Sequence, residues 1–194
     1  MARNNNPRRV RGLYPRVALV SVTTFAACLM SLVPRLGRAV PLDLYGHLPT
    51  LEDMALSPDG SRIAFAGSRG GTAQIYTMAP DGSDAHALTQ SADPATAPVY
   101  SPDGSRIAYV VVPGSGNARL HVMAADGTGD VTVTDGTDFS TFPSWSPDGR
   151  KLAFMAQHDG AWQVYIIGAN GARLTPLTSG SGTNLFPVWT PDGP

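Results

Sequence analysis

The chain has 194 residues, 42% of them hydrophobic, with 14 Lys and Arg against 15 Asp and Glu and a formal net charge of -1. This composition excludes an intrinsically disordered chain and a strongly basic nucleic-acid binder. The charges divide unevenly, however, because residues 1–40 hold seven Arg and no acidic residue, which leaves residues 41–194 with a net charge of -8. Two unlike segments are therefore joined near Val40, and the acidic one argues further against binding to a nucleic-acid backbone.

An uncharged, mostly apolar run of 17 residues spans positions 17–33, with five Arg before it and two after it. The run is long for the core of a signal peptide and short for a membrane span, so it predicts an N-terminal apolar helix that is either a cleaved signal peptide or an anchor in the cytoplasmic membrane. The excess of Arg on its N-terminal side favours export of the domain that comes after the run. Residues 1–39 are thus predicted to be the targeting segment and residues 40–194 a periplasmic or extracellular domain. Cys28 is the only cysteine, which excludes a disulfide within one chain.

A tetrapeptide with the sequence Ser/Thr-Pro-Asp-Gly recurs four times after Val40, at spacings of 44, 45 and 44 residues. Pro presets the backbone of a turn and Gly accepts the left-handed conformation, so each copy predicts a tight hairpin turn. An apolar-Ala-aromatic triplet follows each of the first three copies. Further on, each of these units has an Asp-Gly or Asn-Gly pair, which predicts a second hairpin, and a closing apolar-Thr pair. The four tetrapeptides begin at Ser57, Ser101, Ser146 and Thr190.

Each unit holds four short β-rich runs, which in the third unit are 142–146, 151–155, 163–167 and 173–178. A unit of four strands with a period of 40–45 residues matches one blade of a β-propeller. The sequence therefore predicts an all-β propeller of four-stranded antiparallel blades, with no helix after Pro41. Trp145 and Trp189 precede the turn in successive units and are predicted to pack between blades rather than against a ligand. The predicted blades are about 50–90, 91–135 and 136–180, with a partial fourth at 181–194.

The third unit resembles the TolB-like β-propeller repeat, whose pattern is an aromatic residue, Ser-Pro-Asp-Gly, a basic residue, apolar-Ala-Phe, apolar-Tyr, an Asp-Gly turn and Leu-Thr. The resemblance covers about residues 50–193. It implies a fold but no single function, since such repeats occur in periplasmic TolB, in the propellers of prolyl oligopeptidase-like peptidases and in other exported proteins. The matching residues of the third unit are Trp145 to Phe154, Val164-Tyr165, Asn170-Gly171 and Leu177-Thr178.

Two departures from that family shape the expectations. Fewer than 20 residues separate Val40 from the first tetrapeptide, which leaves no room for the separate α/β domain of TolB itself. The resemblance also implies six blades, whereas three and one strand are predicted here. We therefore expect an incomplete propeller, either a fragment of a longer protein or part of an assembly that closes with another chain, because an open stack exposes an apolar face and strand edges.

The turns at one end of the predicted blades are nearly identical, whereas the loops at the other end differ from unit to unit. Variation among copies of one scaffold is typical of a recognition surface. The variable loops are 68–72, 90–96, 113–117, 135–141, 157–162 and 179–184. The residues predicted to contact a protein partner there are Arg69, Asp93, Asp138, His158, Asp159 and Asn184.

Other candidate sites receive weaker support. The Asp of each tetrapeptide is predicted to be structural, because it is fixed in its own turn. The Asp126-Thr128-Asp130 loop lacks the further carboxylates of a calcium site. No pair among the four histidines has metal-ligand spacing, so His47, His86, His121 and His158 are predicted to be filler or surface residues, and neither a metal nor a cofactor is predicted.

The sequence also predicts no catalytic residues. It contains no Gly-x-Ser-x-Gly motif and no phosphate-binding glycine loop that opens a helix. The favoured hypothesis is a non-enzymatic, extracytoplasmic scaffold that binds a protein partner, with self-association as a further way to close the propeller. The alternatives are the N-terminal propeller of an exported prolyl oligopeptidase-like serine peptidase whose catalytic domain is missing, and a truncated non-functional fragment.

Overall fold

The computed structural model of the chain describes residues 17–19, 53–69 and 71–192. Three four-stranded antiparallel sheets follow one another along the sequence, and the described residues contain no helix. The first sheet contains β2 (Met54–Leu56), β3 (Ile63–Gly67), β4 (Gln74–Met78) and β5 (His86–Ala87). The second contains β6 (Ala95–Tyr100), β7 (Arg106–Val111), β8 (Arg119–Ala124) and β9 (Val131–Thr132). The third contains β10 (Phe139–Trp145), β11 (Lys151–His158), β12 (Ala161–Gly168) and β13 (Thr175–Pro176).

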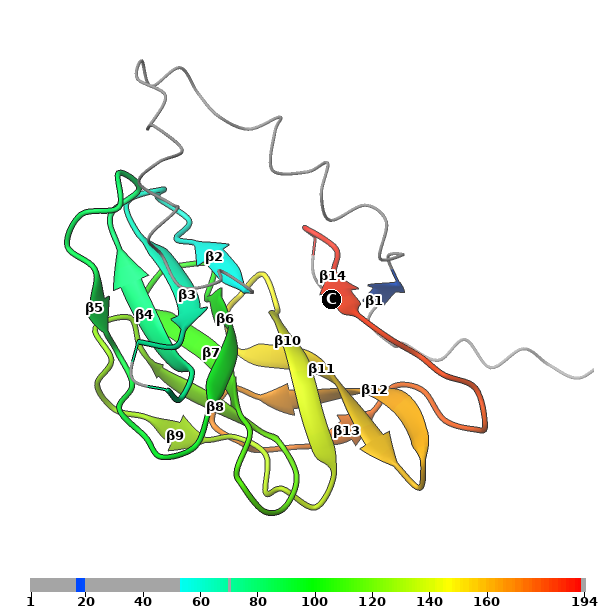
Figure 1. Ribbon diagram of the computed structural model, residues 1–194. Helices are drawn as coiled ribbons and strands as arrows, with labels where there is room; N and C mark the ends of the chain where they lie inside the picture. Colours follow the sequence, from blue (N-terminus) through cyan, green and yellow to red (C-terminus); the bar gives the residue numbers. More distant parts are fainter. Residues whose placement is uncertain (1–16, 20–52, 70, 193–194) are drawn as a thin grey trace, which may run out of the picture.

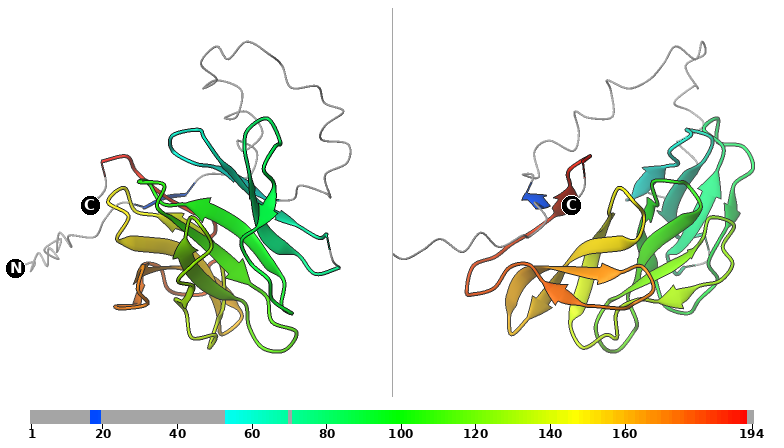
Figure 2. Two further views of the ribbon diagram at one scale, coloured as in Figure 1. Left: turned by 90° about the vertical axis from the view of Figure 1, so that its left-hand side faces the viewer. Right: turned by 180° about the vertical axis from the view of Figure 1, so that it is seen from behind.

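The three sheets lie side by side and spread outward from a common inner side (Figure 1). Their first strands, β2, β6 and β10, lie next to one another on the inner side, and β5, β9 and β13 form the outer edges. Figure 2 shows the same succession of sheets from two other sides. This arrangement is that of propeller blades, as the 44-residue period predicts.

Hydrophobic residues fill the space between successive sheets. Ile75 of the first sheet belongs to one buried cluster with Ile107 and Met123 of the second. Leu120 of the second sheet belongs to another with Phe154 of the third. Because both faces of the middle sheet are covered, its strands carry runs of apolar residues rather than a strict alternation.

Each tetrapeptide forms the hairpin turn that the sequence predicts. In the second sheet the Gly104 N–H donates to the carbonyl oxygen of Ser101 at 2.9 Å, and Gly104 has a φ of 71°. The same hydrogen bond recurs from Gly60 and Gly149 in the other two sheets. These positive φ values explain why glycine closes the motif.

The hairpin between β11 and β12 differs from the prediction. The two strands pair from Lys151 with Gly168 to His158 with Ala161, so the loop predicted over 157–162 shrinks to Asp159 and Gly160. Both residues have positive φ, 48° and 80°, as a two-residue hairpin turn requires. The variable segment of this sheet is therefore mostly paired strand rather than loop.

A β-bulge interrupts the inner strand of the second and third sheets. The register shifts between Thr96 and Val99 in β6 and between Thr141 and Ser144 in β10. Ala97, Phe142 and Phe186 occupy the same repeat position and have φ values of 50°, 52° and 53°. The Phe142 and Phe186 rings meet edge to face, with centroids 4.8 Å apart.

One further strand follows the third sheet. β14 (Pro187–Trp189) pairs antiparallel with β1 (Val17–Leu19). Of the apolar helix predicted over 17–33, the structure describes only these first three residues, which are a strand, and the remainder lies outside the described residues. Among the residues that the structure describes, no helix is long and apolar enough to cross a membrane.

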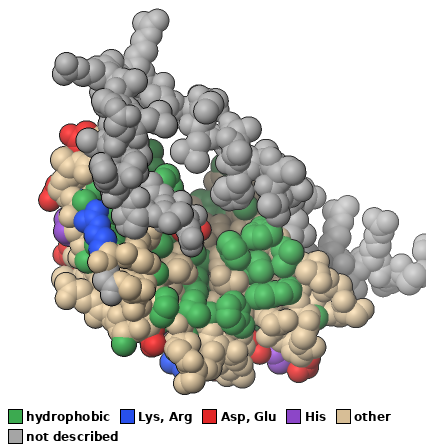
Figure 3. Space-filling view, viewed as in Figure 1, with side chains coloured by type: hydrophobic (Ala, Val, Ile, Leu, Met, Phe, Trp, Pro, Cys, Tyr) green, Lys and Arg blue, Asp and Glu red, His purple; other side chains and the backbone are tan. Residues whose placement is uncertain are grey.

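Figure 3 shows hydrophobic side chains gathered over the third sheet on the side turned toward the viewer.

Candidate functional site

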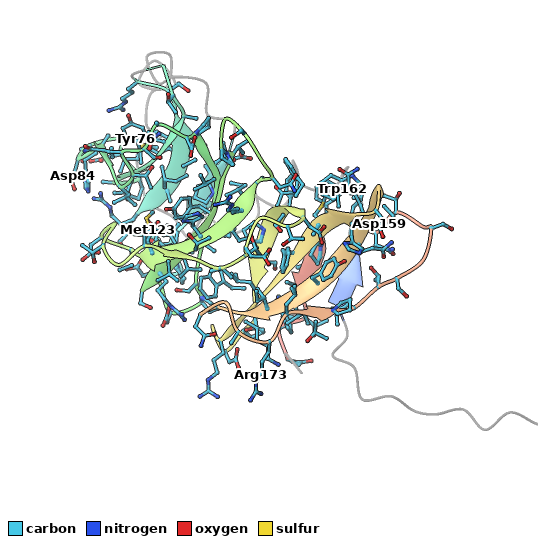
Figure 4. The ribbon with its side chains drawn as sticks, turned by 90° about the horizontal axis from the view of Figure 1, so that it is seen from below. Tyr76, Asp84, Met123, Asp159, Trp162 and Arg173 are labelled. Atoms are coloured by element: carbon cyan, nitrogen blue, oxygen red, sulfur yellow. The ribbon has the colours of Figure 1, made fainter. Side chains whose placement is uncertain are left out.

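Each sheet has two ends with different characters. The turn end carries the tetrapeptide turns and the Asp-Gly or Asn-Gly turns, and the loop end carries the connections within and between sheets that vary in sequence. Figure 4 shows the two ends in the third sheet, where Asp159 and Trp162 lie at the loop end and Arg173 lies far from them at the turn end.

Polar groups at the turn end satisfy one another. The Ser101 Oγ–H donates to Asp103 Oδ1 at 2.6 Å, and the same Oγ accepts the Arg106 N–H at 3.0 Å. The hydrogen bond from Ser101, with smaller contributions from Ser105, lowers the pKa of the Asp103 carboxyl from 3.8 to about 2. Equivalent contacts hold Asp59 and Asp148. The prediction that these carboxylates are structural is confirmed.

The turns of neighbouring sheets also contact each other. Trp145 Nε1–H donates to the carbonyl oxygen of Val99 in the second sheet at 3.1 Å. The Arg106 guanidinium lies 4.7 Å from the Trp145 ring and donates to the Gly149 carbonyl oxygen at 2.6 Å. Trp189 makes the corresponding bond to Ser144. Both tryptophans thus pack between repeats, as predicted, and the turn end works as a structural clamp.

Three of the six predicted partner-binding residues come together at the loop end of the third sheet. His158 Nδ1 lies 3.0 Å from Asp138 Oδ2, and its Nε2 lies 3.5 Å from Asp159 Oδ2. The Asp138 hydrogen bond, together with the charges of Asp138 and Asp159, raises the pKa of the His158 imidazole above 6.5. The side chains of His158 and Asp159 are 55% and 92% exposed, so this charged cluster is open to solvent.

The other three predicted residues make their contacts with groups outside that cluster. Arg69 sits over the Tyr76 ring in the first sheet, with its guanidinium carbon 5.0 Å from the ring centroid. Asp93 Oδ1 accepts the Gly114 N–H at 3.2 Å in the second sheet. Asn184 Nδ2–H donates to Gln163 Oε1 at 3.1 Å. The structure therefore divides the predicted surface among several local sites, and partner binding by these residues stays a prediction.

A cavity of about 200 Å³ lies between the first and second sheets, and the sequence did not predict it. Tyr109 Oη–H donates to Asp130 Oδ1 at 2.8 Å, and His121 Nδ1 lies 3.0 Å from Asp130 Oδ2. Burial, reinforced by the Asp130 hydrogen bond and charge, raises the pKa of Tyr109 far above its usual value, so its hydroxyl stays a donor. The residues lining the cavity are Thr89, Ser91, Asp93, Ala95, Tyr109, Val111, Pro113, Arg119, His121, Asp130 and Thr132.

Neither site has the ligand set of a metal centre. The described part of the chain contains no group of three His, Cys, Asp or Glu side chains that could hold a metal ion. The arrangement at the loop end can instead offer hydrogen bonds and charges to a partner, and the cavity is lined by polar and charged side chains.

Three blade-like sheets around a common inner side, with four strands each, define a β-propeller. Residues 93–194 match the protein family of the TolB β-propeller domain, and the chain belongs to that family. It is 40% identical to the uncharacterized peptidase YuxL of Bacillus subtilis over 65 residues, which are 33% of this chain and 10% of that protein.

Solved structures show the same fold. A putative TolB from Agrobacterium tumefaciens superposes with a TM-score of 0.67 and 25% identity, over 72% of this chain and 50% of that one. A puromycin-hydrolyzing peptidase from Mycobacterium tuberculosis has a TM-score of 0.59 and 24% identity, over 67% of this chain and 22% of that one. The chain thus spans half or less of the length of these relatives.

Proposed function

We propose that this protein is a non-enzymatic scaffold that binds a protein partner through its loop end, outside the cytoplasm. The observation that carries the proposal is the cluster of Asp138, His158 and Asp159, in which His158 and Asp159 are exposed and lie on the paired β11–β12 hairpin. Pre-organised side chains on rigid strands lose little entropy on binding. The likeness to a TolB structure supports the proposal further.

Crosslinking at defined positions tests this proposal. A photoreactive amino acid replaces Asp159 at the loop end or, as the matched control, the exposed Asp59 at the turn end, in cells of the source organism. We expect a discrete crosslinked protein from position 159 and none from position 59. Adducts from the turn end alone, or from neither position, would contradict partner binding at the loop end.

The extracytoplasmic placement rests on the sequence of the leader, with five Arg before its apolar run and two after it. Alkaline phosphatase fused after the last residue would be active only on the far side of the membrane. We expect activity from this fusion, and its loss when residues 17–33 are deleted. An inactive but stably produced fusion would place the domain in the cytoplasm. The mass of the exported product would show whether the leader is cleaved.

A second candidate function is that of the propeller domain of a serine peptidase. It is favoured by the sequence likeness to YuxL and by the fold shared with the puromycin-hydrolyzing peptidase. A fluorophosphonate probe reacts with the activated serine of such enzymes. The scaffold proposal expects no labelling of the protein isolated from its source organism, whereas a labelled product would favour the peptidase.

A further inference from the structure

One position in the repeat holds glutamine in two sheets and arginine in the sheet between them. Gln74, Arg119 and Gln163 begin or lie near the start of the third strand of their sheets, and each precedes its closing Thr by 15 residues. The three sheets share one backbone arrangement, so the glutamine and arginine contacts at this position can be compared directly.

In the first and third sheets the glutamine fastens the loop that leads to the next sheet. Gln74 Nε2–H donates to the Ser91 carbonyl oxygen at 2.9 Å, and its Oε1 accepts the Ser91 N–H at 3.0 Å. Gln163 Nε2–H donates to the carbonyl oxygens of Gly180 and Gly182 at 2.8 and 2.9 Å. The amide nitrogen of the glutamine thus holds the loop backbone, and its Oε1 also accepts the hydroxyl hydrogen of the closing Thr.

Arg119 does not hold the loop in the second sheet. Asn117 holds it instead, because its Nδ2 donates to the carbonyl oxygens of Gly136 and Thr137 at 3.2 and 2.8 Å. The Arg119 Nε is buried and has no hydrogen-bond partner. A buried donor on a charged group is costly to leave unpaired, so the Nε–H lacks an acceptor. The guanidinium as a whole lies close enough to Asp135 to add, after the hydrogen bonds from Thr137, to the lowering of the pKa of that carboxyl.

The same sheet departs from its neighbours at three more positions. The first and third sheets place a stacked Phe-Tyr pair there, Phe65 with Tyr76 and Phe154 with Tyr165. The second sheet has Tyr109 beside His121, with ring centroids 5.4 Å apart. Asp130 is hydrogen-bonded to the Tyr109 hydroxyl and to His121 Nδ1. The other two units have Ala85 and Leu174 at the position of Asp130.

All four departures line the same cavity of about 200 Å³. Between the second and third sheets, by contrast, Phe154 and Tyr165 pack against the core. Replacing an apolar filling by a Tyr-Asp-His network and a partly buried arginine whose Nε–H lacks an acceptor is the pattern expected of a polar ligand site, where a few placed polar groups fix the ligand's orientation. The volume is below the roughly 300–1,000 Å³ of sites for drug-sized molecules, which restricts the ligand to a small one.

We propose that this cavity binds a small monocarboxylate with a hydrogen-bond donor on the neighbouring carbon, such as an α-hydroxy or α-amino acid. The carboxylate pairs with Arg119, whose guanidinium suits bidentate contact. The donor faces Asp93 and Asp130, which line the same cavity. Two carboxylates beside one guanidinium disfavour a doubly charged phosphate, because like charges repel.

The side-chain Nε–Hε signal of Arg119 in a ¹H–¹⁵N spectrum of the full-length chain reports directly on this site. We expect L-lactate or L-alanine to shift the signal saturably. Lactamide and alaninamide should not shift it, because they lack the carboxylate. Inorganic phosphate should not shift it either, because the doubly charged anion is repelled by the Asp93 and Asp130 carboxylates. Failure of both acids, or saturation by the amides or by phosphate, would overturn the proposal. These comparisons need only the natural chain.

Arg119→Gln provides the variant test, because it restores the residue that both neighbouring sheets accept at this position. We expect the variant to fold, with acid affinity measured at the Thr132 backbone amide reduced about tenfold or more, the loss expected for one charged hydrogen bond. Arg173→Gln at the turn end is the matched control and should retain the natural affinity. Unchanged binding in Arg119→Gln would overturn the assignment of the carboxylate to Arg119.

Discussion

The turn end of the sheets and the loop end of the third sheet place their charged side chains in different surroundings. At the turn end, Asp103 is tied to the hydroxyl of its own turn, and Arg106 and Trp145 tie that turn to the next sheet. At the loop end, His158 and Asp159 make contacts only with their own small cluster and remain open to solvent. The turn end therefore stabilises the fold, and the proposed recognition surface lies at the opposite end, so substitutions at the two ends should affect different measurements.

The largest expected effect at the turn end is that of Gly127→Ala. A Cβ at Gly127 would lie 2.9 Å from the Leu88 carbonyl oxygen of the first sheet, and the residue has a φ of 88°. We expect the free energy of unfolding to fall by about 2–4 kcal/mol in urea titrations. The control is Gly60→Ala, which shares the positive φ but meets nothing within 4 Å and should lose only about 1–2 kcal/mol. Equal losses would show that contact between the sheets is unimportant there.

The next effect is that of Trp145→Phe, which removes the Nε1–H donor to Val99 and weakens the stacking on Arg106. The side chain is only 8% exposed. We expect a loss of about 2 kcal/mol, from one hydrogen bond and a cation–π contact. Trp162→Phe at the loop end is the matched control, since Trp162 meets Phe139 edge to face, and it should lose less. The reverse order would contradict the clamp at the turn end.

Ser101→Ala should have a smaller effect on stability and a distinct effect on titration. The Arg106 N–H loses its side-chain acceptor, which costs about 1 kcal/mol. The pKa of Asp103 should rise from about 2 toward 3.8, because its largest hydrogen bond is lost. A carboxyl with a lowered pKa stabilises the fold above its unfolded pKa and loses this effect as the pH falls toward 2, so the variant should lose less stability over that range. A carboxyl titration by NMR that still gives about 2 would refute the role of Ser101.

The smallest effect on stability is expected from Asp138→Asn at the loop end. The pKa of His158 should fall toward 6.5, because Asp138 is the main cause of its rise. A raised histidine pKa favours the fold below the unfolded pKa and ceases to do so as the pH passes the folded pKa. Since His158 is exposed to solvent, which screens the pair, the free energy of unfolding should stay nearly unchanged. NMR titration of the imidazole measures the shift, and Asp159→Asn should give a smaller one.

The repeat made the fold predictable from the sequence. The tetrapeptides fixed the hairpins, and the predicted middle strands 151–155 and 163–167 lie within β11 and β12. Two boundaries went wrong for local reasons. β10 starts at Phe139 because the bulge lets pairing continue beyond Phe142, and β13 is short because only Thr175 and Pro176 pair with β12.

The candidate sites were only partly predictable. Variation in the loops indicated Asp138, His158 and Asp159, which do meet. The cavity was missed because its residues lie mostly on strands, where His121 was predicted to be filler. A signal was present, since Arg119 departs from Gln74 and Gln163, but its meaning depends on burial and on the missing hydrogen-bond partner, which spacing alone does not show.

The bulge on the inner strands has a consequence for engineering the stability of the fold. Ala97, Phe142 and Phe186 hold a left-handed backbone that glycine would adopt without strain. Alanine at position 97 and phenylalanine at positions 142 and 186 therefore carry backbone strain in the second, third and fourth units. Glycine at position 142 or 186 would release that backbone strain but would also remove the contact between the Phe142 and Phe186 rings. The strain at these two positions is therefore the energetic cost of that contact.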